Sequence, residues 1–267
     1  MARPLRLEFP GALYHITSRG NERRPIFRSD RDRKKFLDFL GETARRFGWS
    51  ITAWVLMTNH FHLVVQIAEP NLSRGMHWLN SRYAGWFNRI RKRSGHLFQG
   101  RFKALLIEKE AYFAEVLRYV VLNPVRAHMV ERPEEYNWSS YQATAGYHAA
   151  PDWFDLKSAL EFFHPDRDAA QSNYKEFVCA AIADSEALWD KVTLHLSWNR
   201  GVDKEDAEDR RNEAALDRSS PSAACCRTSE DSHDRRRSGE SCRHDRRLDS
   251  RHTRGRTPPS GGVDRMA

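Results

Sequence analysis

The chain has few cysteines and no long apolar run. Its four cysteines are Cys179, Cys225, Cys226 and Cys242, with no CxxC pair and none near the histidines discussed below. They argue against a structural zinc site and a disulfide framework. No run approaches the ~18 apolar residues of a membrane span, and the N-terminal residues have no apolar core of signal-peptide length. We therefore expect a cytoplasmic protein with no membrane partner.

The C-terminal quarter lacks aromatic residues. Residues 201–267 contain no Phe, Trp, Tyr or Ile, and all eight Trp lie before position 200. Such a segment cannot bury enough apolar surface to offset the entropy lost on ordering. We expect a main domain over 1–150, a helical extension over 151–200, and a disordered tail rich in Arg, Asp and Ser over 201–267.

Positive charge is concentrated in the first part of the chain. Residues 1–100 hold 18 Lys and Arg against 7 Asp and Glu, although the whole chain has a formal charge of +8. A basic domain that carries aromatic residues suggests a polyanionic partner, most simply nucleic acid.

Hydrophobic periodicity predicts four strands and three helices. The strands are expected over 12–18, 50–57, 60–67 and 104–108, and the helices over 30–47, within 72–95, and over 110–122. We expect Pro124 to end the third helix, because proline cannot continue it. This order predicts an α+β fold, with a ferredoxin-like or RRM-like antiparallel sheet and helices packed on one face. The other face would then stay open.

Two histidines, His60 and His62, share one face of the strand over 60–67, because successive side chains in a strand alternate. Such a pair can place two imidazole nitrogens on one divalent metal and leave positions for oxygen ligands and a phosphate. Alone the pattern is weak, since histidine pairs in strands are more often surface or hydrogen-bonded core residues.

Tyr119 and Asn123 stand one helical turn apart and so face the same direction near the end of the third helix. One interpretation is a core aromatic residue with a satisfied hydroxyl. The other is that Tyr119 is a nucleophile and Asn123 a neutral oxygen ligand of the metal site. A phenol has a pKa of about 10, so the metal would act mainly on the other reactant, a phosphate.

Four segments together resemble a known family. They are HFH at 60–62, SRGNERRPIF at 18–27, FQGRFKA at 98–104 and YVVLNPVRA at 119–127. In their order along the chain and in their spacing, these segments are similar to those of the HUH single-tyrosine transposases, especially the REP-associated branch with its IS200-like domain. The likeness covers about residues 5–145. The resemblance implies a DNA transposase that uses Mg²⁺ or Mn²⁺. Such an enzyme would act as an endonuclease and strand transferase on single-stranded DNA folded into hairpins.

The resemblance also implies roles for residues. His60, His62 and Asn123 would be the metal ligands, and Tyr119 would attack the scissile phosphate to leave a 5′-phosphotyrosine and a free 3′-OH. The expected DNA contacts come from the basic loops: Arg19, Asn21, Arg23, Arg24, Arg101 and Lys103.

Two features depart from the family pattern. Glycine is expected where this chain has His128. The tail after residue 200 resembles nothing in the family, and we interpret it as a frameshifted or degenerate C-terminal region.

Two other functions stay open from the residues alone. A non-catalytic nucleic-acid-binding module would need only an RRM-like sheet and the basic residues. A metal-dependent hydrolase would cleave without a protein–DNA bond. The sequence does not decide between a monomer and a homodimer.

Overall fold

A computed structural model describes residues 7–107 and 109–182, without the side chains of residues 109–111. The predicted tail over 201–267 lies outside the described residues, as do residues 183–200 of the predicted extension. None of the described helices is long and apolar enough to cross a membrane.

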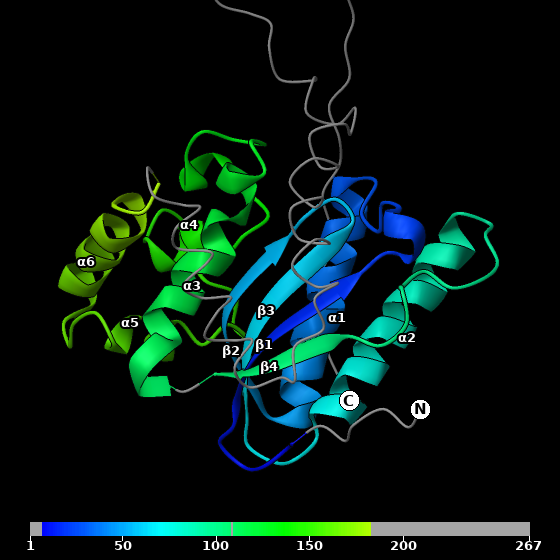
Figure 1. The fold of residues 1–267 in the computed structure, drawn as a ribbon, viewed down its shortest axis with the longest axis horizontal. Helices are drawn as coiled ribbons and strands as arrows, with labels where there is room; N and C mark the ends of the chain where they lie inside the picture. Colours follow the sequence, from blue (N-terminus) through cyan, green and yellow to red (C-terminus); the bar gives the residue numbers. More distant parts are fainter. Residues whose placement is uncertain (1–6, 108, 183–267) are drawn as a thin grey trace, which may run out of the picture. The chain divides into compact units, whose positions relative to one another are not determined.

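The sheet has four antiparallel strands in the order β2-β3-β1-β4 (Figure 1). These strands are β1 (Leu13–Arg19), β2 (Trp49–Leu56), β3 (His60–Ile67) and β4 (Lys103–Ile107). One helix follows β1, a second follows β3, and β1 and β3 pair at the centre. This is the ferredoxin-like arrangement, so the predicted α+β fold class is confirmed.

Two helices, α1 (Asp30–Phe47) and α2 (Leu72–Ile90), cover one face of the sheet. Phe36 of α1 lies at their junction, with ring centroids 4.6 Å from Phe61 of β3 and 5.2 Å from Tyr83 of α2. All three side chains are fully buried. Since burying a Phe side chain stabilises a fold by roughly 2 kcal/mol, this cluster is a main contribution to the first core.

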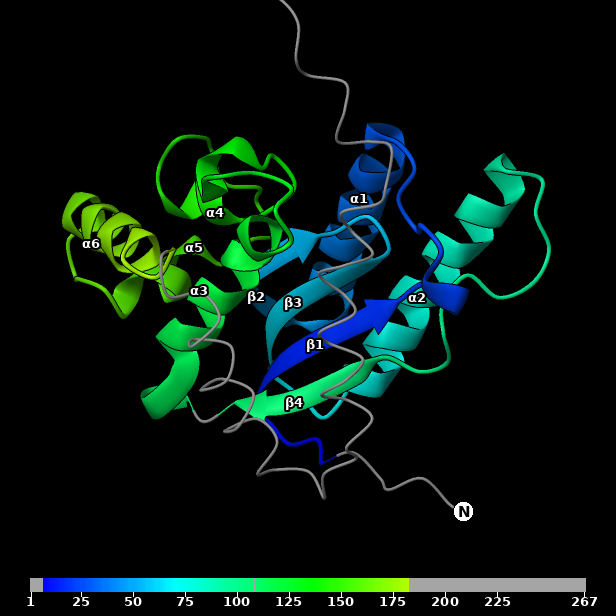
Figure 2. The same cartoon turned by 45° about the horizontal axis from the view of Figure 1, so that its top comes forward.

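The opposite face, which we expected to be open, is covered by α3 (Lys109–Arg126). Val55 and Val64 of the sheet share a second core with Val116 and Val120 of α3. Figures 1 and 2 show α3 on the other side of the sheet from α1 and α2. The reason lies in α3 itself, because eight of the ten side chains from residue 113 to 122 are buried, and a helix with so wide an apolar surface needs cover on more than one side.

Further helices follow α3 in the chain. They are η2 (Pro133–Glu135), α4 (Tyr141–Thr144), α5 (Leu156–Glu161) and α6 (Arg167–Cys179). Arg118 of α3 donates to the carbonyl oxygen of Phe177 in α6 at 3.2 Å, and its guanidinium lies 4.1 Å from the centroid of the Phe177 ring. α3 therefore lies between the sheet and α6. The segment before α6 instead runs along the edge strand β2, where Leu56 N donates to Trp138 O at 2.8 Å and Asp155 N to Ile51 O at 2.9 Å.

Pro124 lies inside α3 and does not end it, so the prediction of an end near residue 122 was wrong. Proline has no N–H to donate to the carbonyl four residues back, which here belongs to Val120. The side chain of Asn123 supplies a substitute, because its Nδ2 donates to the carbonyl oxygens of Tyr119 at 2.9 Å and of Val120 at 3.3 Å.

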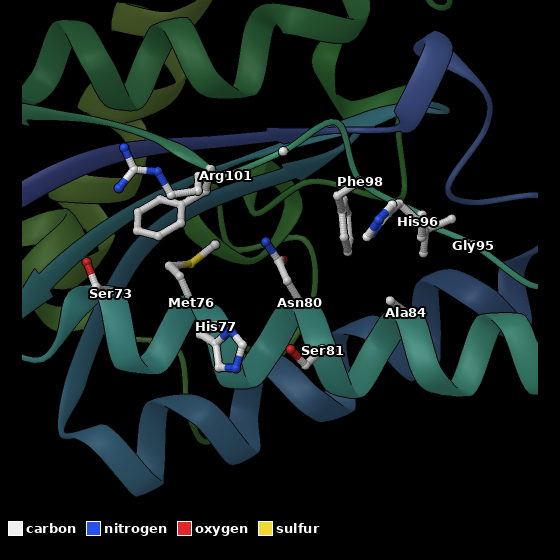
Figure 3. A pocket seen from close by; sticks show the side chains of 13 residues that line it. Ser73, Met76, His77, Asn80, Ser81, Ala84, Gly95, His96, Phe98 and Arg101 are labelled. Atoms are coloured by element: carbon white, nitrogen blue, oxygen red, sulfur yellow. The ribbon is translucent and has the colours of Figure 1, made fainter. Parts of the chain in front are cut away.

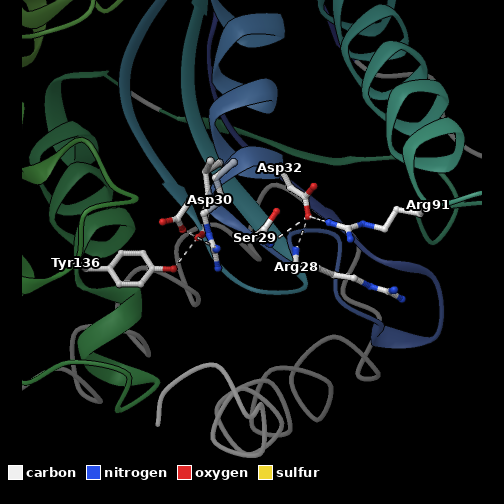
Figure 4. A network of polar contacts seen from close by, with 8 residues as sticks. Arg28, Ser29, Asp30, Asp32, Arg91 and Tyr136 are labelled. Carbon is white, nitrogen blue, oxygen red and sulfur yellow. Dashed lines mark hydrogen bonds and ion pairs between the residues drawn. The ribbon is translucent and has the colours of Figure 1, made fainter. Parts of the chain in front are cut away.

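The N-terminus of α1 is fastened to the end of α2 by Asp32, whose carboxylate is buried (Figure 4). Asp32 Oδ2 accepts from the backbone N–H groups of Arg28 at 2.7 Å and Ser29 at 3.1 Å. It also forms an ion pair with Arg91, directly after α2. These bonds fix the last residues of the loop between β1 and α1. The earlier part of this loop holds Asn21, Arg23 and Arg24, which the sequence predicts to contact DNA.

The chain leaves α3 through His128, which has a φ of +53°. A left-handed conformation costs a residue with a Cβ atom roughly 1 kcal/mol, and glycine avoids that cost. The backbone thus explains why glycine is expected at this position.

Replacing His128 by Gly should therefore stabilise the protein. We expect His128→Gly to raise the free energy of unfolding by about 0.5–1 kcal/mol, measured by urea denaturation. His128→Ala is the matched control, because alanine keeps the Cβ atom and should give no gain. Equal gains from both substitutions would contradict the explanation by backbone strain.

Candidate active site

Five polar side chains gather on the sheet face that α3 covers. The register places Thr17 opposite His62 and Arg19 opposite His60 on the two central strands. His15 lies two residues before Thr17 and so shares this face. The predicted common face of His60 and His62 is thus observed, and β1 adds three side chains to it.

The imidazole of His62 is held from β1. Its Nδ1 lies 2.9 Å from His15 Nε2 and 3.1 Å from Thr17 Oγ1. The two imidazole rings are stacked, with centroids 5.1 Å apart and planes 7° from parallel. The other nitrogen, Nε2 of His62, is buried and has no hydrogen-bond partner among the described residues.

The imidazole of His60 is held by its neighbour in sequence. Its Nδ1 lies 2.6 Å from Asn59 Oδ1. Because an amide oxygen can only accept, Nδ1 carries the proton and Nε2 keeps its lone pair. The rings of His60 and His62 have centroids 5.0 Å apart and are nearly perpendicular.

Both histidines are held neutral. Burial, followed by the charge of Arg19, lowers the pKa of His60 from 6.5 to about 3. Burial also lowers the pKa of His62 well below 6.5, and His60, His15, Arg19 and Arg126 lower it further. Neutral imidazole is the form that binds metal ions.

The donor set fits a divalent metal ion bound by two histidines. Each Nδ1 has a neighbour that fixes the ring, and each Nε2 is left as a possible ligand, which is how metal-binding histidines are usually oriented. Within residues 7–107 and 109–182, no three His, Cys, Asp or Glu side chains form a group that could hold a metal ion. If the third protein ligand comes from these residues, it would be of another type, such as an amide oxygen.

Tyr119 of α3 lies against the histidines of its own chain. Its ring centroid is 5.8 Å from that of His62 and 5.5 Å from that of His15, with both pairs edge to face. The guanidinium of Arg126 lies 5.4 Å from the Tyr119 centroid. The structure thus brings the predicted nucleophile and one predicted ligand together without a second subunit.

Asn123 lies on the next turn of α3, where its side-chain N–H groups bond to backbone carbonyls as described above. An amide has one donor side and one acceptor side, so the bonds leave Oδ1 as the group that could bind a cation. The hydrogen bonds that compensate for Pro124 therefore also orient the side-chain oxygen of Asn123.

The six predicted DNA-contacting residues lie in two segments that touch. One holds Arg19 and the residues of η1 (Asn21–Arg23) with Arg24, and the other holds Arg101 and Lys103. The segments are joined by hydrogen bonds from Asn21 N to Leu97 O and from Gln99 N to Arg19 O, each 2.8 Å long. Lys103 lies opposite Thr17 in the β1–β4 register, so it borders the histidine face.

Arg101 lines a groove of about 450 Å³ between α2 and residues 95–102 (Figure 3). Met76 and Phe98 supply apolar walls, and Asn80 adds an amide. Asn80 Nδ2 donates to Ser18 Oγ at 3.3 Å, so the groove adjoins the end of β1.

The sequence patterns did not identify His15, Thr17 and Asn59 as part of the site. His15 and Thr17 belong to a segment recognised as a strand, but only the strand register shows that they meet His62. Asn59 lies in the two-residue link between the strands predicted over 50–57 and 60–67, a position that by itself predicts no role in the site. The available signal was its position directly before a candidate metal ligand.

Comparison with known proteins gives a family match and likenesses to solved structures. Residues 9–123 match the family model described as "Transposase IS200 like". No curated protein matches the chain. A solved REP-associated tyrosine transposase bound to a REP hairpin is similar, with 18% identity and a TM-score of 0.48 over 57% of this chain and 89% of that chain. A tRNA(His) guanylyltransferase from Saccharomyces cerevisiae has 8% identity and a TM-score of 0.34 over 68% of this chain and 77% of that chain.

The lowered pKa of His60 should make the metal-free protein sensitive to acid. Below pH 6.5 the unfolded chain binds a proton at His60 that the folded chain takes up only near pH 3. In EDTA, we expect the free energy of unfolding to fall as the pH is lowered from 6.5 to 5, by at most about 1.4 kcal/mol per pH unit from this residue. His60→Gln should make the fall shallower in urea denaturation at each pH. An unchanged slope would show that His60 does not contribute.

Proposed function

We propose, on the premise that residues 9–123 form an IS200-like transposase domain, that this chain cuts and rejoins single-stranded DNA through a covalent bond to Tyr119. The family match confirms the recognition made from the sequence and the assignment as a DNA transposase. The metal, the form of the DNA and the roles of single residues are our proposals.

One observation carries the proposal: the edge-to-face packing of Tyr119 on His62, whose Nε2 has no partner among the described residues. A tyrosine that served only the core would need no neighbouring pair of neutral histidines. A pair of buried metal ligands would need no tyrosine. Their contact supports a site in which a phosphate is bound and attacked at one place.

We assign His60, His62 and Asn123 as the ligands of Mg²⁺ or Mn²⁺. When bound, such an ion would polarise the scissile phosphate and stabilise charge on the leaving oxygen. The protein contributes two neutral imidazoles and one oriented amide oxygen. Waters and the phosphate would complete the coordination, as is usual for these hard cations.

In the proposed step, the phenol oxygen of Tyr119 forms a bond to phosphorus while the bond from phosphorus to the 3′ oxygen breaks. The phenol loses its proton to solvent, and the leaving oxygen gains one to become a 3′-OH. A 5′-phosphotyrosine stores the energy of the broken bond, so a 3′-OH of the same or another strand can reverse the step without ATP. Because Tyr119 and His62 come from one chain, a monomer would suffice.

We propose single-stranded DNA with hairpin structure as the substrate, as the resemblance of the four sequence segments implies. The two touching basic segments border the histidine face and would bind the phosphates near the cut. The groove that Arg101 lines, with Phe98 in its wall, offers a place for an unpaired base.

Replacement of Tyr119 by Phe should abolish the covalent intermediate. With Mg²⁺ or Mn²⁺ and a labelled hairpin DNA, the wild-type protein should give an adduct on a denaturing gel, whereas Tyr119→Phe should give none. Tyr112→Phe is the matched control on the same helix and should keep at least half of the adduct. An adduct from Tyr119→Phe would remove Tyr119 as the nucleophile. Binding without any wild-type adduct would favour a non-catalytic module.

Metal binding should be visible without DNA. Mn²⁺ at 100 times its Kd should stabilise the wild-type protein by about 2.7 kcal/mol and raise the Tm by several degrees. We expect His60→Gln and His62→Gln to lose this shift, and His77→Gln, a substitution of an exposed histidine on α2, to keep it. If all three variants keep the shift, the metal binds elsewhere.

A further inference from the structure

The link between β2 and β3 is fastened to the basic loop that follows β1. Thr58 O accepts from the N–H groups of Ile26 at 3.0 Å and Phe27 at 3.1 Å, and Asn59 O accepts from Gly20 N at 2.7 Å. These backbone bonds hold the loop along the end of the hairpin. They would form with almost any side chain at position 59.

The side chain of Asn59 adds a connection that only an amide can make. Its Nδ2 donates to Arg23 O at 3.1 Å, and its Oδ1 accepts from His60 Nδ1 at 2.6 Å. The carbonyl of Arg23 can only accept, which fixes the orientation of the amide. That orientation in turn requires the proton of His60 to be on Nδ1.

The loop that Asn59 supports has an unfavourable backbone. Glu22 and Arg23 are consecutive residues with φ values of +54° and +55°, in a region that residues with a Cβ atom adopt at a cost. The loop also closes tightly, since a Cβ atom on Gly20 would lie 2.1 Å from Arg24 O. Such a conformation persists only where neighbouring groups hold it, and the amide of Asn59 is one of those groups.

We propose that Asn59 is a positioning residue with two functions: it fixes the tautomer of His60 that leaves Nε2 available to a metal, and it holds the basic loop in the conformation that binds DNA. Asn59 is 9% exposed, so neither of its bonds is readily replaced by water. This inference rests on the proposed function for the use of the loop, but the tautomer can be tested without metal or DNA.

The first test is ¹⁵N NMR of the imidazole groups in EDTA at pH 7.5. In the wild-type protein His60 should carry its proton on Nδ1. In Asn59→Ala a substantial Nε2–H population should appear, and Mn²⁺ affinity measured by calorimetry should fall by about 10-fold to 100-fold. Thr58→Ser is the control and should change neither. A wild-type proton on Nε2, or the same tautomer in wild type and Asn59→Ala, would overturn the inference.

The second test separates the two bonds. Asn59→Asp keeps an oxygen that accepts from His60 but removes the donor to Arg23 O. We expect it to keep the Nδ1–H tautomer and Mn²⁺ affinity within threefold of wild type, and to bind hairpin DNA at least fivefold more weakly in EDTA. A purely structural role would instead lower the Tm of both variants and leave tautomer and metal affinity unchanged. If Asn59→Asp binds DNA as well as wild type, the loop half of the inference is wrong.

The outcomes also distinguish this inference from the proposed function. A wild-type protein that shows the Nδ1–H tautomer but forms no adduct with DNA would contradict the proposed function and leave the role of Asn59 on His60 intact. If the wild-type protein forms the adduct but the tautomer of His60 is the same in Asn59→Ala, the proposed function stands and the role of Asn59 on His60 is wrong.

Discussion

The pairing of β1 with β3 is the constraint on which the rest of the site depends. Its register sets Thr17 against His62 and Arg19 against His60, and brings His15 into contact with the His62 ring. A shift of one residue would move the β1 side chains to the other face of the sheet, into the core beneath α1 and α2. The two hydrophobic cores, one on each face of the sheet, therefore fix this register. By fixing the register they also fix the positions of the polar side chains of the site.

The electrostatics of the site follow from that burial. Two neutral histidines lie near Arg19 and Arg126, which disfavour any further positive charge on the rings. A second proton on either imidazole is thereby disfavoured. The surroundings thus favour the neutral rings over the protonated rings, and the neutral ring is the form that can bind a metal ion.

Local patterns were enough to predict the strands, α1 and the shared face of His60 and His62. They were not enough for α3, because periodicity identifies a helix but not the surface it covers, and because the amide of Asn123 compensates for Pro124 in a way that no pattern describes. The partners of the histidines were missed for a related reason. His15 and Asn59 act through a strand register and a loop contact, both of which exist only in the folded chain.

The position of α3 between two layers has a consequence for how such a gene can be inherited. Residues 124–182 lie beyond the family match, yet Tyr141, Tyr174 and Val178 share the core that contains Val116 and Val120 of α3. A gene copy cut back to the matched segment would leave the outer side of the tyrosine-bearing helix bare. The matched segment and the helices behind it therefore share one core, so a gene that encodes the folded tyrosine helix has to encode both.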